Sequence, residues 1–167
     1  MITKQQLADS FIHECDVCLH LATKLSDEGM RYQPSEQQRT SLDLLRYLSI
    51  CAIAGMQCMA ANDWTLFTGY QARVKDMTAD QFPAAMQQQK AEIQQFFDNI
   101  TEAELETRQS ALPGVADHKI PLALALMNGP LKWLTAYKMQ LFLYAKAASA
   151  PEIGTPNVWR GRDAVKQ

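Results

Sequence analysis

The nine residues from Ile12 to His20, IHECDVCLH, hold two His, two Cys, one Glu and one Asp. All six of these side chains are able to bind a transition metal, and the two thiols are also able to take part in redox chemistry. They can act together only if the backbone directs them to one place. A metal-binding CxxC pair normally sits on a turn that aims both sulfurs inward. The element around this stretch therefore decides what it can do.

Apolar residues around the stretch recur at steps of four, four, three, four and three: Leu7, Phe11, Cys15, Cys18, Ala22 and Leu25. This spacing predicts one buried stripe on a helix over residues 3–28. At 100° per residue both Cys lie in the stripe, while His13, Asp16 and His20 project from the opposite side. The thiols and imidazoles cannot meet at one ion. We therefore interpret the stretch as buried thiols with solvated histidines.

The composition narrows the classes of function. The chain has 167 residues and a net charge of −2, with no basic excess, which argues against a nucleic-acid partner. The N-terminus lacks the pattern of a signal peptide, and no apolar run reaches membrane-spanning length. We therefore expect a cytoplasmic protein with reduced cysteines and no membrane partner. A sequence rich in Ala, Gln, Leu and Met, with 7 Gly and 7 Pro, predicts an all-helical domain.

Capping residues and helix breakers divide the rest of the chain. We predict helices over 41–61, 78–99, 101–108 and 120–149, a long crossover over 62–77, and a loop over 110–119. Thr78 with Gln81 forms a capping box, and Pro130 after Gly129 should kink the last helix. Four principal antiparallel helices with a long crossover between the second and third predict an all-α four-helix bundle. We expect a single domain over 1–167, with 150–167 as an extended C-terminal tail.

Three stretches carry a family resemblance. SLDLLRYLS from Ser41 to Ser49 and LKWLTAYKMQLFLYAK from Leu131 to Lys146 resemble the second and last helices of the DinB/YfiT-like superfamily. These are bacterial four-helix bundles, many of which are regarded as metalloenzymes. The tail EIGTPNVWRGRD resembles the C-terminal sequence of one uncharacterised branch of the superfamily. The resemblance to that branch implies no activity. The resemblance covers nearly the whole chain and implies a bacterial, DinB-like bundle.

The resemblance also points to positions where a metal site would lie. In the superfamily, one histidine in an LLxHL run and two in an HxxxHRGQL run bind a divalent metal, commonly zinc or nickel. Here Tyr47, Trp133 and Tyr137 stand at the three histidine positions, and Lys138 to Leu141 stand where RGQL would be. Trp offers only a donor, and a Tyr hydroxyl with a pKa near 10 is a poor metal ligand at neutral pH. We therefore predict no metal and no other cofactor.

The three aromatic side chains have two interpretations. In the first, they fill the space that a metal and its ligands would occupy. In the second, they form the floor of a residual pocket that, together with Gln140, orients a small organic ligand. We expect a metal-free binding or interaction domain with no intact catalytic motif. The alternative is a DinB/YfiT-type enzyme, a thiol transferase or metal-dependent hydrolase, using a pocket around Tyr47, Trp133 and Tyr137. His118, in the loop before the last helix, is a candidate acid or base at the mouth of that pocket.

The last predicted helix is apolar over most of its circumference. Asn128, Lys132 and Thr135 fall at steps of four and three and mark one polar seam. A monomer would leave part of the remainder as an exposed apolar patch, so we expect a homodimer through this helix or its neighbour. The competing prediction is a monomer in which Ile153, Val158 and Trp159 of the tail fold back over the same surface.

Overall fold

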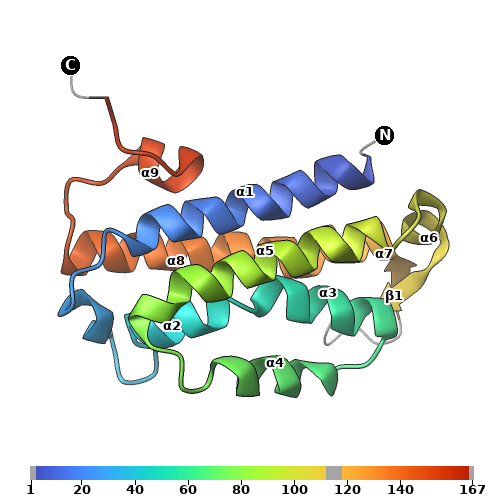
Figure 1. Ribbon diagram of the computed structural model, residues 1–167, viewed down its shortest axis with the longest axis horizontal. Coiled ribbons are helices and arrows are strands. Elements are labelled where there is room, and N and C mark those ends of the chain that lie inside the picture. Colours follow the sequence, from blue (N-terminus) through green and yellow to red (C-terminus); the bar gives the residue numbers. More distant parts are fainter. Residues whose placement is uncertain (1–2, 112–117, 166–167) are drawn as a thin grey trace.

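The computed structural model describes residues 3–111 and 118–165 and shows a bundle of long helices (Figure 1). The bundle consists of α1 (Lys4–Ala22), α2 (Ser41–Leu48), α3 (Cys51–Ala61), α5 (Phe82–Asp98) and α8 (Lys132–Ala148). α1 packs along α5 and α8, and α2 and α3 together form the remaining leg, which contacts the same two helices. The chain is therefore an all-α four-helix bundle, as predicted, with its second leg in two pieces.

Shorter elements connect and cover these legs: η1 (Gly29–Arg31), α4 (Leu66–Val74), η2 (Ala79–Gln81), α6 (Glu102–Thr107), β1 (Gln109–Ala111), β2 (Lys119–Pro121), α7 (Leu122–Leu126), the π-helical η3 (Met127–Leu131) and α9 (Thr155–Arg160). β1 and β2 pair antiparallel, with Ser110 opposite Ile120. The crossover predicted over 62–77 contains a helix, α4, that was not predicted. The prediction of a loop over 110–119 is wrong at its described ends, because these pair as two short strands.

The predicted helix over 41–61 is broken where a side chain from another helix enters it. Ile50 leaves the helical region at φ −132°, and α2 and α3 meet at 43°. Gln89 of α5 is fully buried at this break. Its amide nitrogen donates to the Leu48 carbonyl at 2.8 Å, and its amide oxygen accepts from the Ala52 N–H at 3.1 Å. The side chain satisfies backbone groups that the break releases, which is a recognised cause of a helix kink.

Two other helix ends differ from prediction. α1 ends at Ala22, because the next residues tighten into bonds of the i→i−3 type, from Lys24 N–H to Leu21 and from Leu25 N–H to Ala22. The last helix begins at Leu122, and it changes to a π-helical turn at the expected kink, around Pro130. A π turn accommodates a residue that lacks an N–H donor.

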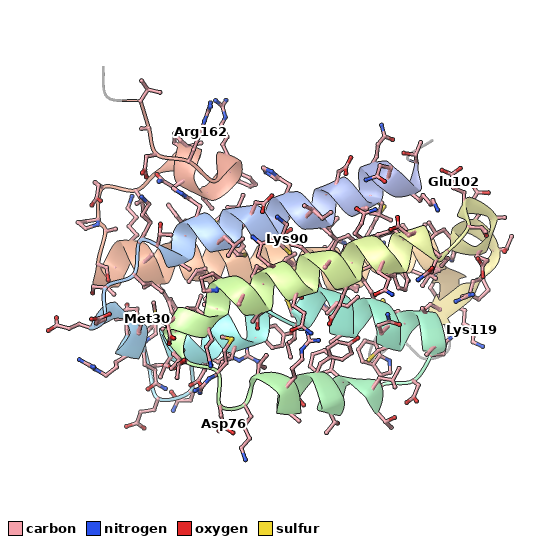
Figure 2. The ribbon with its side chains drawn as sticks, viewed as in Figure 1. Met30, Asp76, Lys90, Glu102, Lys119 and Arg162 are labelled. Atoms are coloured by element: carbon pink, nitrogen blue, oxygen red, sulfur yellow. The ribbon has the colours of Figure 1, made fainter. Side chains whose placement is uncertain are left out.

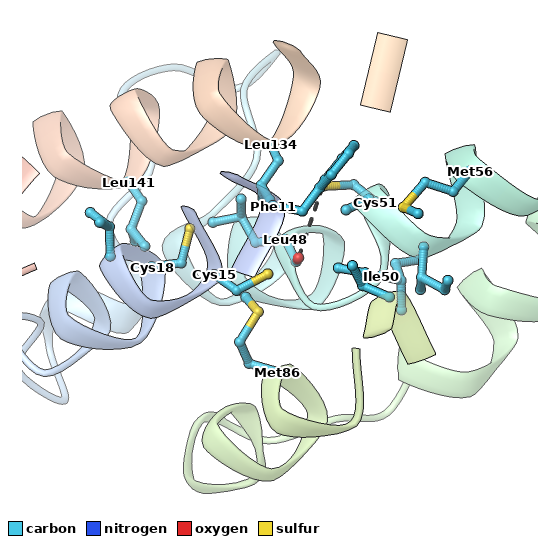
Figure 3. Packing of buried hydrophobic residues seen from close by; sticks show 14 of the residues in the cluster. Phe11, Cys15, Cys18, Leu48, Ile50, Cys51, Met56, Met86, Leu134 and Leu141 are labelled. Atoms are coloured by element: carbon cyan, nitrogen blue, oxygen red, sulfur yellow. Dashed lines mark hydrogen bonds between the residues drawn. The ribbon is translucent and has the colours of Figure 1, made fainter. Parts of the chain in front are cut away.

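The bundle core is built from apolar side chains of all four legs (Figure 3). Cys15 and Cys18 of α1 and Cys51 of α3 are free thiols with no exposed surface. The predicted burial of the two thiols in the opening stretch is therefore confirmed. Among the described residues, no single helix is both long and apolar enough to cross a membrane, and α2 with α3 meets that criterion only as a bent pair.

The C-terminal segment is folded onto the bundle, which corrects the expectation of an extended tail. α9 packs on α1 and also touches α8. Asn157 anchors it: the side-chain oxygen accepts from the Gly154 N–H at 2.9 Å, and the amide nitrogen donates to His20 Nε2 at 3.0 Å and to Asp163 at 2.8 Å. His13 Nε2 lies 2.9 Å from the Trp159 carbonyl oxygen. Both histidines therefore hold the tail. His13 is exposed, as expected, whereas His20 is half-buried.

Candidate functional site

Tyr47, Trp133 and Tyr137 lie where α2 and α3 face α8. The ring centroids of Tyr47 and Tyr137 are 4.7 Å apart, with the rings edge to face. Trp133 packs against Gly55 of α3, where an added Cβ would lie 2.7 Å from the indole. A residue with a side chain at Gly55 would displace the indole, so the small residue is needed for this close approach.

Two further rings extend this group. Phe67 of α4 lies 6.4 Å from Tyr47, and Trp64, just before α4, lies 6.0 Å from Trp133, measured between ring centroids. We call these five residues the ring cluster. The rings pack on one another at distances typical of aromatic pairs. Tyr47 and Tyr137 are thus in contact, and Trp133 lies about one turn before Tyr137 on α8.

Arg39, in the loop before α2, lies beside the ring cluster. The sequence alone did not identify it. Its guanidinium carbon lies 4.4 Å from the ring centroid of Tyr47 and 5.2 Å from that of Tyr137. Such distances are those of cation–π contacts. No hydrogen-bonding or acidic partner for its side chain occurs within residues 3–111 and 118–165. The sequence carries no signal for this contact, because Arg39 lies in a polar connection without periodicity.

The protonation state of Tyr47 restricts its chemistry. Burial, with smaller effects from Cys51 and Tyr137, raises the pKa of Tyr47 well above its usual range, and nearby Arg39 opposes this only in part. The hydroxyl is therefore protonated at neutral pH and acts as a hydrogen-bond donor. It is a poor general base under those conditions, because a base works best when its pKa is near the ambient pH.

Gln140 and His118 have other surroundings than the predicted pocket. The Gln140 amide donates to the Tyr144 hydroxyl at 2.6 Å, and Tyr144 packs edge to face with Tyr32. Gln140 is thus engaged with a different pair of rings. His118 is exposed beside the β-hairpin, and the helix from Leu122 to Tyr137 spans about 22 Å at 1.5 Å per residue. His118 and Tyr137 are therefore well separated along the helix axis, and a role for His118 at the mouth of the pocket stays a prediction.

No group of three or more His, Cys, Asp or Glu side chains in the described part of the chain is arranged to hold a metal ion. The three positions at which the family resemblance would place metal ligands offer one indole N–H and two phenols. These groups do not fit a divalent ion, because an indole cannot accept a metal bond and the Tyr47 phenol stays protonated. No chemistry through a metal follows from the side chains at these positions.

A cleft of about 460 Å³ lies on another side of the bundle, between α3, α4, α5 and α6. A hollow of about 330 Å³ beneath α4 adjoins it and shares Gln57 and Tyr70 with it. Side chains fill much of the space between α4 and the bundle (Figure 2), but hollows remain, among them these two and a third of about 510 Å³ between the end of α4 and the start of α5. Gln95 and Asn99 of α5 line the cleft opposite Gln57. The amides of these three residues make no hydrogen bond to any other described side chain or backbone group.

The charges around the cleft are paired within the protein. Arg73 of α4 binds Glu92 of α5 at 2.6 Å and lies 5.0 Å from the ring centroid of Tyr70. Arg108 binds Glu104 at 2.6 Å at the other end. Each acidic group thus has a basic partner, and the lining is close to neutral. One oxygen of Glu92 is buried and has no hydrogen-bond partner among the described residues.

Comparisons with known proteins bear on the fold alone. No protein-family model matches the sequence, and no curated protein matches it. Among solved structures, it is similar to a DinB-like protein, YjoA, from Bacillus subtilis, with a TM-score of 0.66 and 18% sequence identity. The match covers 85% of this chain and 91% of that one. At this identity the likeness shows the fold, and the chain has a DinB-like fold as predicted.

Proposed function

We propose that this protein is a small-molecule binding protein built on a DinB-like fold, and that its ligand occupies the cleft between α3, α4, α5 and α6. The observation that carries the proposal is the cleft itself. Its volume of about 460 Å³ falls in the range of ligand pockets, about 300–1,000 Å³. Three side-chain amides on its wall have no partner within the described chain. Such groups bind the polar edge of a ligand in exchange for water, without breaking a hydrogen bond within the described part of the protein.

The lining indicates the kind of ligand that would suit this cleft. Tyr70 and Phe96 supply aromatic surface, and Gln57, Gln95 and Asn99 supply both donors and acceptors. The ionic groups are already paired, so a charged ligand would gain little from them and would lose its own hydration. A neutral ring compound with polar substituents is therefore favoured.

The enzyme alternative has weaker support. A thiol transferase or hydrolase acting at the ring cluster needs either a metal or an acid–base pair. The raised pKa of Tyr47 opposes base catalysis at neutral pH. Packing of the rings against one another also leaves less room for a substrate than the cleft does. We therefore assign the function to binding.

A substitution that fills the cleft tests the proposal. Ala60, half-buried on α3, lines the cleft, and a Phe there would occupy much of its volume. Ligand-observed NMR with a set of neutral aromatic amides should detect binding to the wild type and loss of that binding in Ala60→Phe. Ala136→Phe, at an exposed position on α8, is the matched control and should bind as the wild type does.

A milder variant controls for a folding defect in Ala60→Phe. Gln57→Leu keeps the approximate size of the side chain and removes one amide, and it should weaken binding of the same amides about tenfold. Binding that survives unchanged in both Ala60→Phe and Gln57→Leu would contradict the assignment to this cleft. Absence of binding by every member of the set to the wild type would contradict the proposed ligand class.

A further inference from the structure

We propose that Arg39, Tyr47 and Tyr137 form a second binding site, separate from the cleft, for a small oxyanion group such as a carboxylate or a phosphate. The site lies on the outer side of the ring cluster, where the loop before α2 meets α2 and α8. Its central element is a guanidinium within cation–π distance of two phenol rings.

The charge of Arg39 has no acidic partner among the described residues, whereas several other arginines of the bundle are paired. Arg46, Arg73 and Arg108 each pair with an acidic side chain within 3 Å. No acidic group lies within 4 Å of the Arg39 guanidinium in the described ranges. Asp43, the acidic residue that follows it on α2, accepts from Arg46 at 2.9 Å and from Thr40 at 2.7 Å. Arg39 therefore offers a full positive charge to a ligand.

The hydrogen-bond donors of Arg39 are not used within the described part of the chain. A guanidinium is planar, and its five N–H groups point outward in that plane. Its carbon lies within cation–π distance of both rings, and none of its N–H groups bonds to a residue of 3–111 or 118–165. The rings thus hold the side chain in place, which lowers the entropic cost of binding, while the N–H edge stays open. That edge matches the two oxygens of a carboxylate or a phosphate.

The two rings that contact the guanidinium each carry a hydroxyl, which is a further donor. Neither hydroxyl makes a hydrogen bond to another described residue. Tyr47 stays protonated at neutral pH, because burial raises its pKa. A protonated hydroxyl donates well to an anionic oxygen, and hydrogen bonds to charged groups are stronger than those between neutral groups. The combination of one open guanidinium edge and neighbouring hydroxyl donors suits an oxyanion and repels a cation.

A simpler role for Arg39 is to cover the tyrosine rings and stabilise the fold. That role predicts a change in stability on substitution and no response to anions. The two roles are separated by titrating the full-length protein with inorganic phosphate and, in a second arm, with acetate. Ionic strength is held constant with sodium chloride, and two-dimensional NMR follows the Arg39 side-chain Nε–H and the backbone amides of 38–48.

The proposal predicts saturable shifts confined to this region, from phosphate, acetate or both, and the stronger of the two identifies the preferred oxyanion. Arg39→Gln should abolish the response. Arg31→Gln removes the same charge from an exposed position on η1 without ring contacts, and it should respond like the wild type. Tyr47→Phe and Tyr137→Phe keep the rings, and the loss of a hydroxyl donor should weaken binding about tenfold. Ala60→Phe should leave the site intact, because the cleft is elsewhere.

Three results would overturn the proposal. The first is the absence of saturable shifts from either anion. The second is an equal loss of response in Arg39→Gln and Arg31→Gln, which would indicate only a general effect of charge. The third is an unchanged affinity in both Tyr→Phe variants, which would remove the hydroxyls from the site.

Discussion

Replacing Lys138 by Met should destabilise the fold by about 3–5 kcal/mol, because it leaves a carboxylate buried without its counter-charge. Lys138 of α8 has no exposed side-chain surface, and its Nζ lies 2.8 Å from Glu14 Oε2 of α1, whose side chain is 14% exposed. Trp159 of the tail covers the ammonium, with its ring centroid 4.8 Å from Nζ. The ammonium and the carboxylate are close enough for an ion pair, but their angles miss those of a hydrogen bond, so neither atom has such a bond within the described chain.

The cost follows from the environment of the two charges. Each lost most of its hydration on folding, and attraction to the other compensates for that loss. Met fills a similar volume without charge, so Lys138→Met removes the attraction and leaves Glu14 uncompensated. For a chain of this length a change of 3–5 kcal/mol lowers the melting temperature by about 6–20 °C. The double variant Glu14→Leu with Lys138→Met removes both charges and should regain most of the lost stability.

Urea denaturation and thermal melting, each followed by circular dichroism, measure these changes. Lys90→Met is the matched control, because Lys90 of α5 (Figure 2) pairs with Asp16 on the same helix α1, and that pair is 21% and 51% exposed. An exposed pair contributes about 0–1 kcal/mol. The reasoning would be refuted if Lys138→Met cost no more than Lys90→Met, or if the double variant were less stable than Lys138→Met alone.

Four further predictions follow from other features. Burial raises the pKa of Cys15 to about 12 and that of Cys18 well above its usual range, so both thiols should react with a thiol reagent only after denaturation; rapid labelling of the native protein would contradict this. Burial lowers the pKa of His20, so the folded state favours its neutral form; the associated stability should be complete above the unfolded pKa near 6.5 and be lost as the pH falls from there through the lower folded pKa, and His20→Gln should flatten the profile in that window. Protein purified without a metal-affinity tag should carry no stoichiometric transition metal and keep its melting temperature in chelator, and one equivalent of zinc or nickel would disprove this. The homodimer stays a prediction: Leu124 and Leu143, 45% and 56% exposed, lie along α7 and α8, and sedimentation equilibrium at tens of micromolar should show twice 18.8 kDa rather than a monomer.

The fold was predictable because the core is encoded by local periodicity. The stripe on α1 placed Cys15 and Cys18 in the core, and the capping box at Thr78 placed the start of the third leg within a few residues. Such signals depend only on residues close in sequence. The departure from α geometry around Pro130 was predictable for the same reason, since proline acts on its own turn.

The features that sequence reasoning missed depend on contacts between distant residues. The break between α2 and α3 is stabilised by Gln89, which lies 41 residues after the Leu48 carbonyl that it binds. Gln89 stands in a run of glutamines, and nothing local distinguishes a buried amide from its solvated neighbours. The anchoring of α9 through Asn157 and His20 joins residues 137 positions apart. Periodicity within one helix cannot report such pairings.

At the candidate sites, too, the sequence indicated which residue types are present but not how they are arranged. The family resemblance located Tyr47 and Tyr137 and indicated that they replace metal ligands, but it could not show what the new side chains do together. Arg39 supplies that information, because its guanidinium contacts both rings and its N–H groups have no hydrogen-bond partner among the described residues. The position at which the family resemblance would place a metal cation thus has an organic cation beside it. If Arg39 only covered the rings, a neutral side chain of similar size would serve as well, so the response of Arg39→Gln to phosphate and acetate distinguishes a binding site from a packing contact.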